Sequence, residues 1–153
     1  MLKGIDPLIG PPLLHALASM GHSDQLALVD ANYPAYASGK PVFRLDGIDI
    51  MTAARAIFSL IPVDSAIECP VERMEIDGAP HAVTESQREF RSLLSAMSGR
   101  DIQMSSSERT AFYEHARGVY AIVATGETRP YSCFIVSKGT IPDASEVKSR
   151  DLD

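Results

Sequence analysis

The sequence of 153 residues is poor in cysteine, in basic residues and in long apolar runs. Its two cysteines, Cys69 and Cys133, have no close pairing, so we expect reduced core thiols rather than a disulfide. Lys and Arg number 14 against 20 Asp and Glu, for a formal net charge of −6, so no basic stripe is available to neutralise a phosphate backbone. No apolar run is long enough for a membrane span, and a secretory signal is lacking. We therefore expect a cytoplasmic protein without nucleic acid or membrane partners.

Motifs that hold cofactors or nucleophiles are lacking as well. The chain has no Gly-rich dinucleotide fingerprint, no P-loop, no Gly-x-Ser-x-Gly elbow and no His-Glu-x-x-His zinc motif. Its two cysteines form no metal-binding spacing with its four histidines. We expect no metal site and no tightly held cofactor. Any chemistry must then depend on side chains alone.

What is present is enough apolar material for one core, with 45% hydrophobic residues. The pattern predicts a single α/β domain over residues 1–142, with a mixed sheet flanked by helices, and a polar tail over 143–153. Turn signals separate the last two strands, which we expect to form a hairpin. Ser106 or Ser107 is expected to cap the last helix. The predicted helices begin at Pro11, near Asp49, after Thr84 and after Ser107, and the predicted strands cover 25–29, 42–45, 71–76 (one face wet), 120–125 and 133–137.

A histidine and an aspartate flank the first predicted strand. His22 lies in the loop before it and Asp30 follows its last residue. Because imidazole titrates near pH ~6.5, such a pair could move protons at neutral pH. Asp30 would also lie where ligands of open α/β sheets bind. A helix C-terminal histidine and a turn-forming aspartate explain the same residues, and Asp24 either orients His22 or forms a polar turn.

Two further polar residues are candidates for a ligand site. Arg109 near a helix start opposes the helix dipole, which fits either a positive charge facing a ligand or a solvated side chain. Tyr131 begins the last predicted strand, and its hydroxyl either lines a pocket or borders the sheet. The residues alone leave both alternatives open.

Several blocks of the sequence, taken together, resemble the D-ribose pyranase and L-fucose mutarotase family, with the fucose branch closer. The resemblance extends over nearly all of the chain to about Pro142. The blocks are Met1-Leu2-Lys3-Gly4-Ile5, residues 14–24, Asp30-Ala31-Asn32-Tyr33-Pro34-Ala35, Arg44-Leu45-Asp46-Gly47, Phe112-Tyr113-Glu114-His115-Ala116, Ala124-Thr125-Gly126-Glu127 and Lys138-Gly139.

This resemblance implies an α/β subunit of a ring-forming, sugar mutarotase-like fold, commonly a decamer, with sugar sites near subunit contacts. By position, His22 matches the family's proton donor, and Asp30 and Arg109 match sugar-binding residues. Tyr131 matches the first residue of a sugar-binding Tyr-Gly-Asn tract, which reads Tyr131-Ser132-Cys133 here. A thiol is a weaker hydrogen-bonding group than an amide, so the change at Cys133 bears on sugar specificity. Ser132 adds a Cβ where the family has glycine.

The resemblance implies a monosaccharide mutarotase that works without metal or nucleotide. Opening a cyclic hemiacetal needs a proton at the ring oxygen as one leaves the anomeric hydroxyl, and closing on the other face gives the second anomer. His22 would donate that proton, Asp30 and Arg109 would bind the sugar, and Tyr131 would orient it or move a proton. The alternatives are a monosaccharide-binding module with little catalysis, which the Ser132-Cys133 change favours, and an assembly protein whose ring is its purpose.

Overall fold

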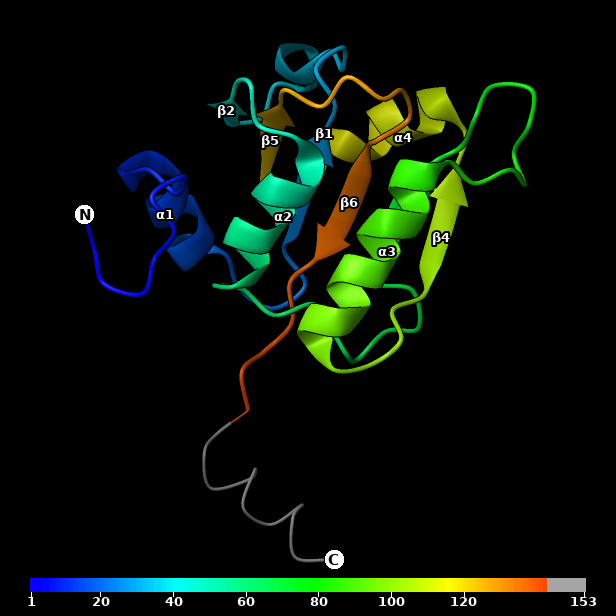
Figure 1. Cartoon of the computed structure of the whole chain (residues 1–153). Helices are drawn as coiled ribbons and strands as arrows, with labels where there is room; N and C mark the ends of the chain where they lie inside the picture. Colours follow the sequence, from blue (N-terminus) through cyan, green and yellow to red (C-terminus); the bar gives the residue numbers. More distant parts are fainter. Residues whose placement is uncertain (143–153) are drawn as a thin grey trace, which may run out of the picture.

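The computed structural model describes residues 1–142, which form one six-stranded sheet with helices on both faces (Figure 1). The strand order is β2-β5-β1-β6-β3-β4, and the tail over 143–153 lies outside the described residues. The strands are β1 (Gln25–Val29), β2 (Val42–Leu45), β3 (Val71–Met74), β4 (Met104–Ser107), β5 (Ala121–Thr125) and β6 (Phe134–Ser137). The helices are α1 (Pro11–Ser19), η1 (Ala35–Ser38), α2 (Ile50–Phe58), α3 (Glu85–Ser98) and α4 (Arg109–Ala116).

The sheet is mixed because β6 runs against both of its neighbours. It pairs antiparallel with β1 and β3, whereas β1 with β5, β2 with β5 and β3 with β4 are parallel pairs. The expected α/β domain with a mixed sheet is therefore confirmed. As a result, the carboxyl ends of β1 and β3 and the amino end of β6 lie at one edge of the sheet, at the top in Figure 1.

The expected hairpin of the last two strands is wrong, because β1 lies between β5 and β6. Residues 126–133 connect these two strands, and a connection of that length is not the tight turn that fixes a hairpin register. β1 needs partners on both sides, since Leu26, Ala27, Leu28 and Val29 are fully buried. The central position of β1 satisfies its backbone on both edges and buries both of its faces.

Alternate residues of β1 belong to two different cores. Leu26 and Leu28 pack into the larger core with α1, α2 and α3, whereas Ala27 and Val29 pack into the core beneath α4. This division follows from the two-residue period of a strand. In Figure 1, α2 and α3 cover the near face and α4 lies behind the sheet.

Local signals explain several element boundaries. Thr84 and Gln87 form the expected capping box of α3, and Gly99 ends that helix with φ of 67°. The expected cap of α4 is wrong, because Ser106 and Ser107 belong to the edge strand β4. Glu108 caps α4 instead, its carboxylate accepting from the backbone N–H groups of Thr110 and Ala111.

Two other local expectations differ from the structure. β3 has no wet face of the kind expected, because Arg73 is buried and donates to Gln87 Oε1 (3.5 Å) and to the Pro80 carbonyl (3.2 Å). Pro34, Gly39 and Pro41 predict irregular structure over 31–41, yet this stretch contains the short helix η1. The burial of Arg73 depends on tertiary contacts that periodicity does not report, whereas η1 is closed by local hydrogen bonds such as that from the Ala37 N–H to the Pro34 carbonyl (3.2 Å).

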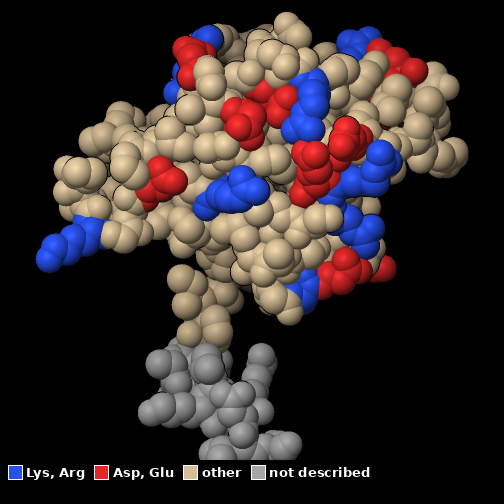
Figure 2. Space-filling view, viewed as in Figure 1, with Lys and Arg blue, Asp and Glu red and all other residues tan. Residues whose placement is uncertain are grey.

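The near face of the molecule carries charges of both signs. Figure 2 shows Lys and Arg interspersed with Asp and Glu over α2 and α3, and Arg129 pairs there with Glu89 (2.9 Å) and Glu127 (3.1 Å). Within residues 1–142, no helix is both long enough and apolar enough to cross a membrane.

Candidate functional site

Asp30 lies at the carboxyl end of β1 and is 8% exposed. Its Oδ1 accepts from the Asn32 backbone N–H (3.0 Å), and its Oδ2 accepts from Cys133 Sγ (3.3 Å). Burial raises the pKa of the Asp30 carboxyl, although these donors oppose that effect. The parallel strands β1 and β5 both end here, so the position matches the ligand-binding edge of an open sheet.

The Tyr131-Ser132-Cys133 segment enters the same edge just before β6. Tyr131 has φ of 59°, an unusual value for a residue with a side chain. Gln87 Nε2 donates to the Tyr131 carbonyl (2.9 Å) and to the Met74 carbonyl (2.8 Å). Ser132 Oγ lies 2.6 Å from Ser86 Oγ, and both serines are buried. The first turn of α3 thus fixes the backbone of this segment.

Arg109 reaches this edge from the first residue of α4. Its Nε donates to Asp77 Oδ2 (2.9 Å), and the Asp77 backbone N–H donates to Tyr131 Oη (3.3 Å). The guanidinium carbon lies 5.6 Å from the centre of the Tyr113 ring, within cation–π range. Tyr33 packs edge-on against that ring at 5.3 Å. Arg109 is therefore part of a group of charged and aromatic side chains that includes Asp77, Tyr113 and Tyr33.

The structure brings together five of the six predicted site residues: Asp30, Arg109, Tyr131, Ser132 and Cys133. Sequence reasoning missed the residues that connect them. Asp77 contacts Arg109, and Gln87, which also belongs to the capping box of α3, contacts the Tyr131 carbonyl. Nothing in the sequence marks Ser86 or Tyr113 as a neighbour of this group.

His22 lies at the opposite end of β1. The Ser23 N–H donates to the Lys138 carbonyl (2.9 Å), which places the loop beside the end of β6. β1 has five residues, so it spans about 16 Å. In one chain His22 therefore does not contact Asp30. The expectation that these two side chains of the same chain form a proton-transfer pair is wrong. Its ring contacts Asp64 instead, with Nε2 3.3 Å from Asp64 Oδ1.

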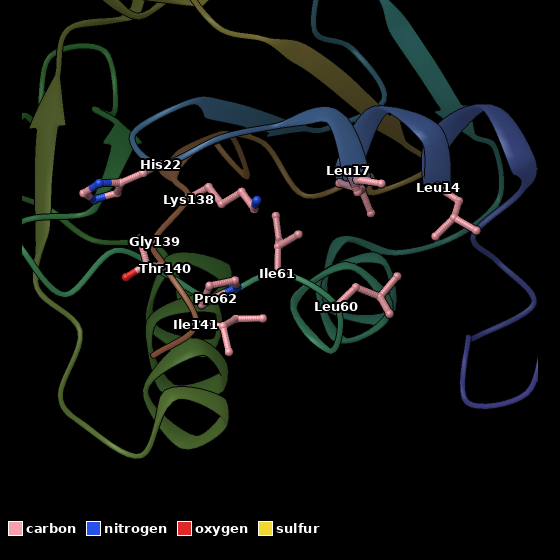
Figure 3. A pocket seen from close by; sticks show the side chains of 11 residues that line it. Leu14, Leu17, His22, Leu60, Ile61, Pro62, Lys138, Gly139, Thr140 and Ile141 are labelled. Atoms are coloured by element: carbon pink, nitrogen blue, oxygen red, sulfur yellow. The ribbon is translucent and has the colours of Figure 1, made fainter. Parts of the chain in front are cut away.

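The imidazole of His22 lies at the rim of a cavity of about 460 Å³, apart from Leu14 and Leu17 (Figure 3). The cavity is walled mainly by apolar side chains of α1, of the segment that follows α2 and of the segment after β6. Lys138 Nζ donates to the Met20 carbonyl. A half-exposed imidazole (48%) can exchange a proton with a molecule at this rim, whereas the apolar walls offer few partners for sugar hydroxyls. The lining residues are Leu14, Leu17, Ala18, His22, Leu60, Ile61, Pro62, Lys138, Gly139, Thr140 and Ile141.

Within residues 1–142, no three His, Cys, Asp or Glu side chains gather closely enough to hold a metal ion. The amino end of β1 has the half-exposed imidazole of His22. The carboxyl end has the buried carboxylate of Asp30 among hydrogen-bond donors and aromatic rings. Those groups suit acid–base chemistry on a small polar molecule.

A small α/β domain with a polar group at the carboxyl ends of its strands, here the group around Asp30, fits the class of sugar-related proteins that the sequence resembles. Residues 3–141 match the RbsD / FucU transport protein family, and the chain belongs to that family.

The chain is 37% identical over 142 residues to the L-fucose mutarotase of Actinobacillus pleuropneumoniae serotype 5b (strain L20), covering 93% of this chain and 99% of that one. It is 38% identical over 146 residues to the fucose mutarotase of Homo sapiens, with 92% and 94% covered. Among solved structures, the fucose mutarotase of Streptococcus pneumoniae in complex with L-fucose superposes with a TM-score of 0.84 at 33% identity, covering 92% of this chain and all of that one.

Proposed function

We propose that the protein is a monosaccharide mutarotase, an isomerase that interconverts the anomers or ring forms of L-fucose or a related sugar. The observation that carries this proposal is the match over almost the whole length to L-fucose mutarotases, together with the polar group around Asp30. That group offers a carboxylate, a guanidinium and a phenol, which are suitable partners for sugar hydroxyls.

In the proposed reaction, His22 is the general acid. Its imidazolium gives a proton to the ring oxygen, the bond from that oxygen to the anomeric carbon breaks, and the anomeric hydroxyl loses its proton to water. The open aldehyde rotates and closes through the reverse steps, so no oxidation or reduction occurs. Asp30 and Arg109 bind sugar hydroxyls, and Tyr131 orients the sugar. General acid catalysis contributes typically ~10²–10⁴-fold, which suffices for a reaction that already proceeds in water.

The proposal requires that His22 and Asp30 of different subunits share one site. Within one chain they lie at opposite ends of β1, which is about 16 Å long, so a sugar bound at the Asp30 group needs its acid from elsewhere. A ring in which each subunit presents its His22 rim to the Asp30 group of a neighbour provides that acid. We propose a homo-oligomer of this kind, a decameric ring, acting in the cytoplasm. Two free cysteines in the described chain suit a reducing compartment.

Mixed oligomers test the reaction and the shared site together. His22→Ala and Asp30→Asn subunits, each expected to have lost at least ~10²-fold of the anomer exchange, are coexpressed with different tags. In a random mixture, about one site in four receives an intact His22 and an intact Asp30, so exchange should recover to roughly a quarter of the wild-type rate. NMR exchange between the anomeric resonances of L-fucose measures it.

Two controls make this result decisive. Each variant alone, purified by the same two tags, reports the residual rate, and circular dichroism reports that both fold. Mixed oligomers as slow as the single variants would contradict a site shared between subunits. Wild-type protein that did not accelerate exchange of any monosaccharide would contradict the mutarotase itself.

A binding module without useful catalysis is the second candidate function. Cys133 carries a thiol where the family that the sequence resembles has an amide. Cys133 is 1% exposed and its thiol is already hydrogen-bonded to Asp30, so it has little capacity to hydrogen-bond a sugar. Saturation-difference NMR on equilibrated fucose, ribose and galactose separates the two candidates. Binding without faster anomer exchange would favour the module.

A further inference from the structure

The guanidinium of Arg109 has a carboxylate partner in the group around Asp30. Its Nε donates to Asp77 Oδ2 (2.9 Å), and among residues 1–142 Asp77 is the one carboxylate outside its own helix cap that pairs with it. Glu108, next to Arg109 in sequence, directs Oε2 to backbone N–H groups in the first turn of α4 instead. Asp77 therefore determines the charge that this guanidinium presents to a ligand.

The ion pair of Asp77 and Arg109 is open to solvent. The Arg109 side chain is 41% exposed, and that of Asp77 is 50% exposed. Exposed ion pairs contribute little to stability, because water screens both charges and two long side chains lose freedom. A molecule that approaches from solvent can reach both groups. We therefore expect the pair to affect what binds here more than how stably the chain folds.

The turn after β3 holds Asp77 at this place. Gly78 has φ of 76°, a conformation that suits glycine because a Cβ makes it costly, and Ile76 and Ala79 form a bridge across the turn. The Asp77 backbone N–H donates to Tyr131 Oη (3.3 Å). Asp77 thus contacts two of the proposed sugar-binding residues, one through its side chain and the other through its backbone.

We propose that Asp77 is a specificity-determining residue, whose charge makes the site select neutral monosaccharides over those that carry a carboxylate. A guanidinium without a partner binds carboxylates strongly, because two of its N–H groups match the two carboxylate oxygens. With Asp77 on Nε of Arg109, an anionic sugar must displace a carboxylate that the turn holds or bind beside it against like-charge repulsion. A neutral sugar meets neither obstacle, since its hydroxyls can donate to one side chain and accept from the other.

This inference rests on the proposed function for its choice of substrate, but the ion pair can be measured without a sugar. The measurement is ¹H–¹⁵N NMR of the full-length protein, with the Arg109 Nε–H resonance assigned by Arg109→Lys. In the wild type this hydrogen should exchange slowly with water, because it is bonded to Asp77. Asp77→Ala removes the acceptor and should speed that exchange several-fold. Equal exchange in both proteins would show that the pair does not form in solution and would overturn the inference.

The selectivity is tested with two sugars that differ at one carbon. L-galacturonate has the ring stereochemistry of L-fucose, but a carboxylate replaces the methyl group at C6. Titrations by saturation-difference NMR give the Kd of each sugar, and the wild type should favour L-fucose. Asp77→Asn removes the charge but keeps the backbone N–H for Tyr131 and an oxygen for Arg109, so this preference should fall by about 10-fold. Adding Arg109→Gln should remove the gain for L-galacturonate, since the guanidinium is the group that binds it.

Glu75→Gln is the matched control for net charge. Its carboxylate lies two residues before Asp77, accepts from Ser106 Oγ (2.8 Å), and carries the same charge. The preference for L-fucose should stay at its wild-type value in this variant. A preference that is unchanged in Asp77→Asn, that falls equally in Glu75→Gln, or that favours L-galacturonate in the wild type overturns the inference. A wild type that bound neither sugar would reject the proposed function and with it the choice of substrate, whereas the Nε–H exchange would still decide the ion pair.

Discussion

The two ends of β1 are built on different principles. At the carboxyl end, Asp30 and Ser132 are buried and hydrogen-bonded, and α3, α4 and β6 all contribute to the group. At the amino end, His22 is half-exposed at the rim of an apolar cavity, and its ring contacts the buried carboxylate of Asp64. Under the proposed function this difference is a division of work, in which the buried, hydrogen-bonded end binds the sugar and the half-exposed imidazole supplies the proton.

The largest expected effect comes from truncating a side chain of the larger core, which should loosen both ends of β1 and so remove the difference between them. Phe134 begins β6, directly after Cys133, and its ring stacks on Phe90 with centroids 3.8 Å apart. Phe134→Ala should lower the free energy of unfolding by about 3–5 kcal/mol, because it removes a fully buried aromatic side chain and leaves a cavity. Urea unfolding measures this loss. Tyr120→Ala, at an exposed site, is the control, and an equal loss there would contradict the argument.

A smaller substitution should affect the Asp30 end alone. Ser86→Ala leaves the buried Ser132 hydroxyl without its partner and should cost about 1–3 kcal/mol of unfolding free energy. The double variant Ser86→Ala, Ser132→Ala removes both hydroxyls and should recover most of that loss, as measured by thermal and urea unfolding. If the double variant were as unstable as the sum of the single variants, the two hydroxyls would not be coupled.

The smallest expected effect is on pH dependence. Burial raises the folded-state pKa of Asp30 above its ordinary 3.8, so folding is favoured by its protonation below that value. This contribution is lost as pH rises through the raised pKa, so the burial of Asp30 opposes folding more at neutral pH than at low pH. Asp30→Asn should therefore raise Tm at pH 7, with a difference that narrows toward pH 3.5, even though the variant loses activity.

Asp46 provides the opposite control for this pH dependence. It is exposed, and its hydrogen bonds from Arg44 lower its pKa. Asp46→Asn should therefore leave Tm at pH 7 unchanged or slightly lower. Scanning calorimetry across the pH range measures both variants, and a rise in Tm for Asp46→Asn equal to that for Asp30→Asn would remove burial as the cause.

Local signals in the sequence predicted much of the fold. The capping box at Thr84 and the apolar run of β1 lie within short segments, so both were readable from the residues. The placement of β1 between β5 and β6 was not readable, because hydrophobic periodicity reports burial and not pairing partners. Turn signals between neighbouring strands favoured a hairpin instead.

The sequence predicted the main residues of the candidate site but not the residues that contact and hold them. Resemblance to a family picked out His22, Asp30, Arg109 and Tyr131, but the residues that hold them come from distant parts of the chain. Asp64 lies 42 residues from His22 and Ser86 lies 46 residues from Ser132. Asp24, the neighbour in sequence, was the natural orienting group for His22 and serves a turn instead. Such pairings depend on sheet order, which the sequence pattern did not determine.

The burial of β1 also has a kinetic consequence. Residues Leu26 to Val29 lie in the middle of the sheet, where they pair with β5 and β6 and are fully buried. Their amide hydrogens should be among the last to exchange with deuterium, and only when the whole domain unfolds. The half-exposed loop that carries His22 can open locally on much shorter timescales. The strand is thus a rigid spacer, so under the proposed function flexing of the sheet does not bring His22 to the Asp30 group of the same chain.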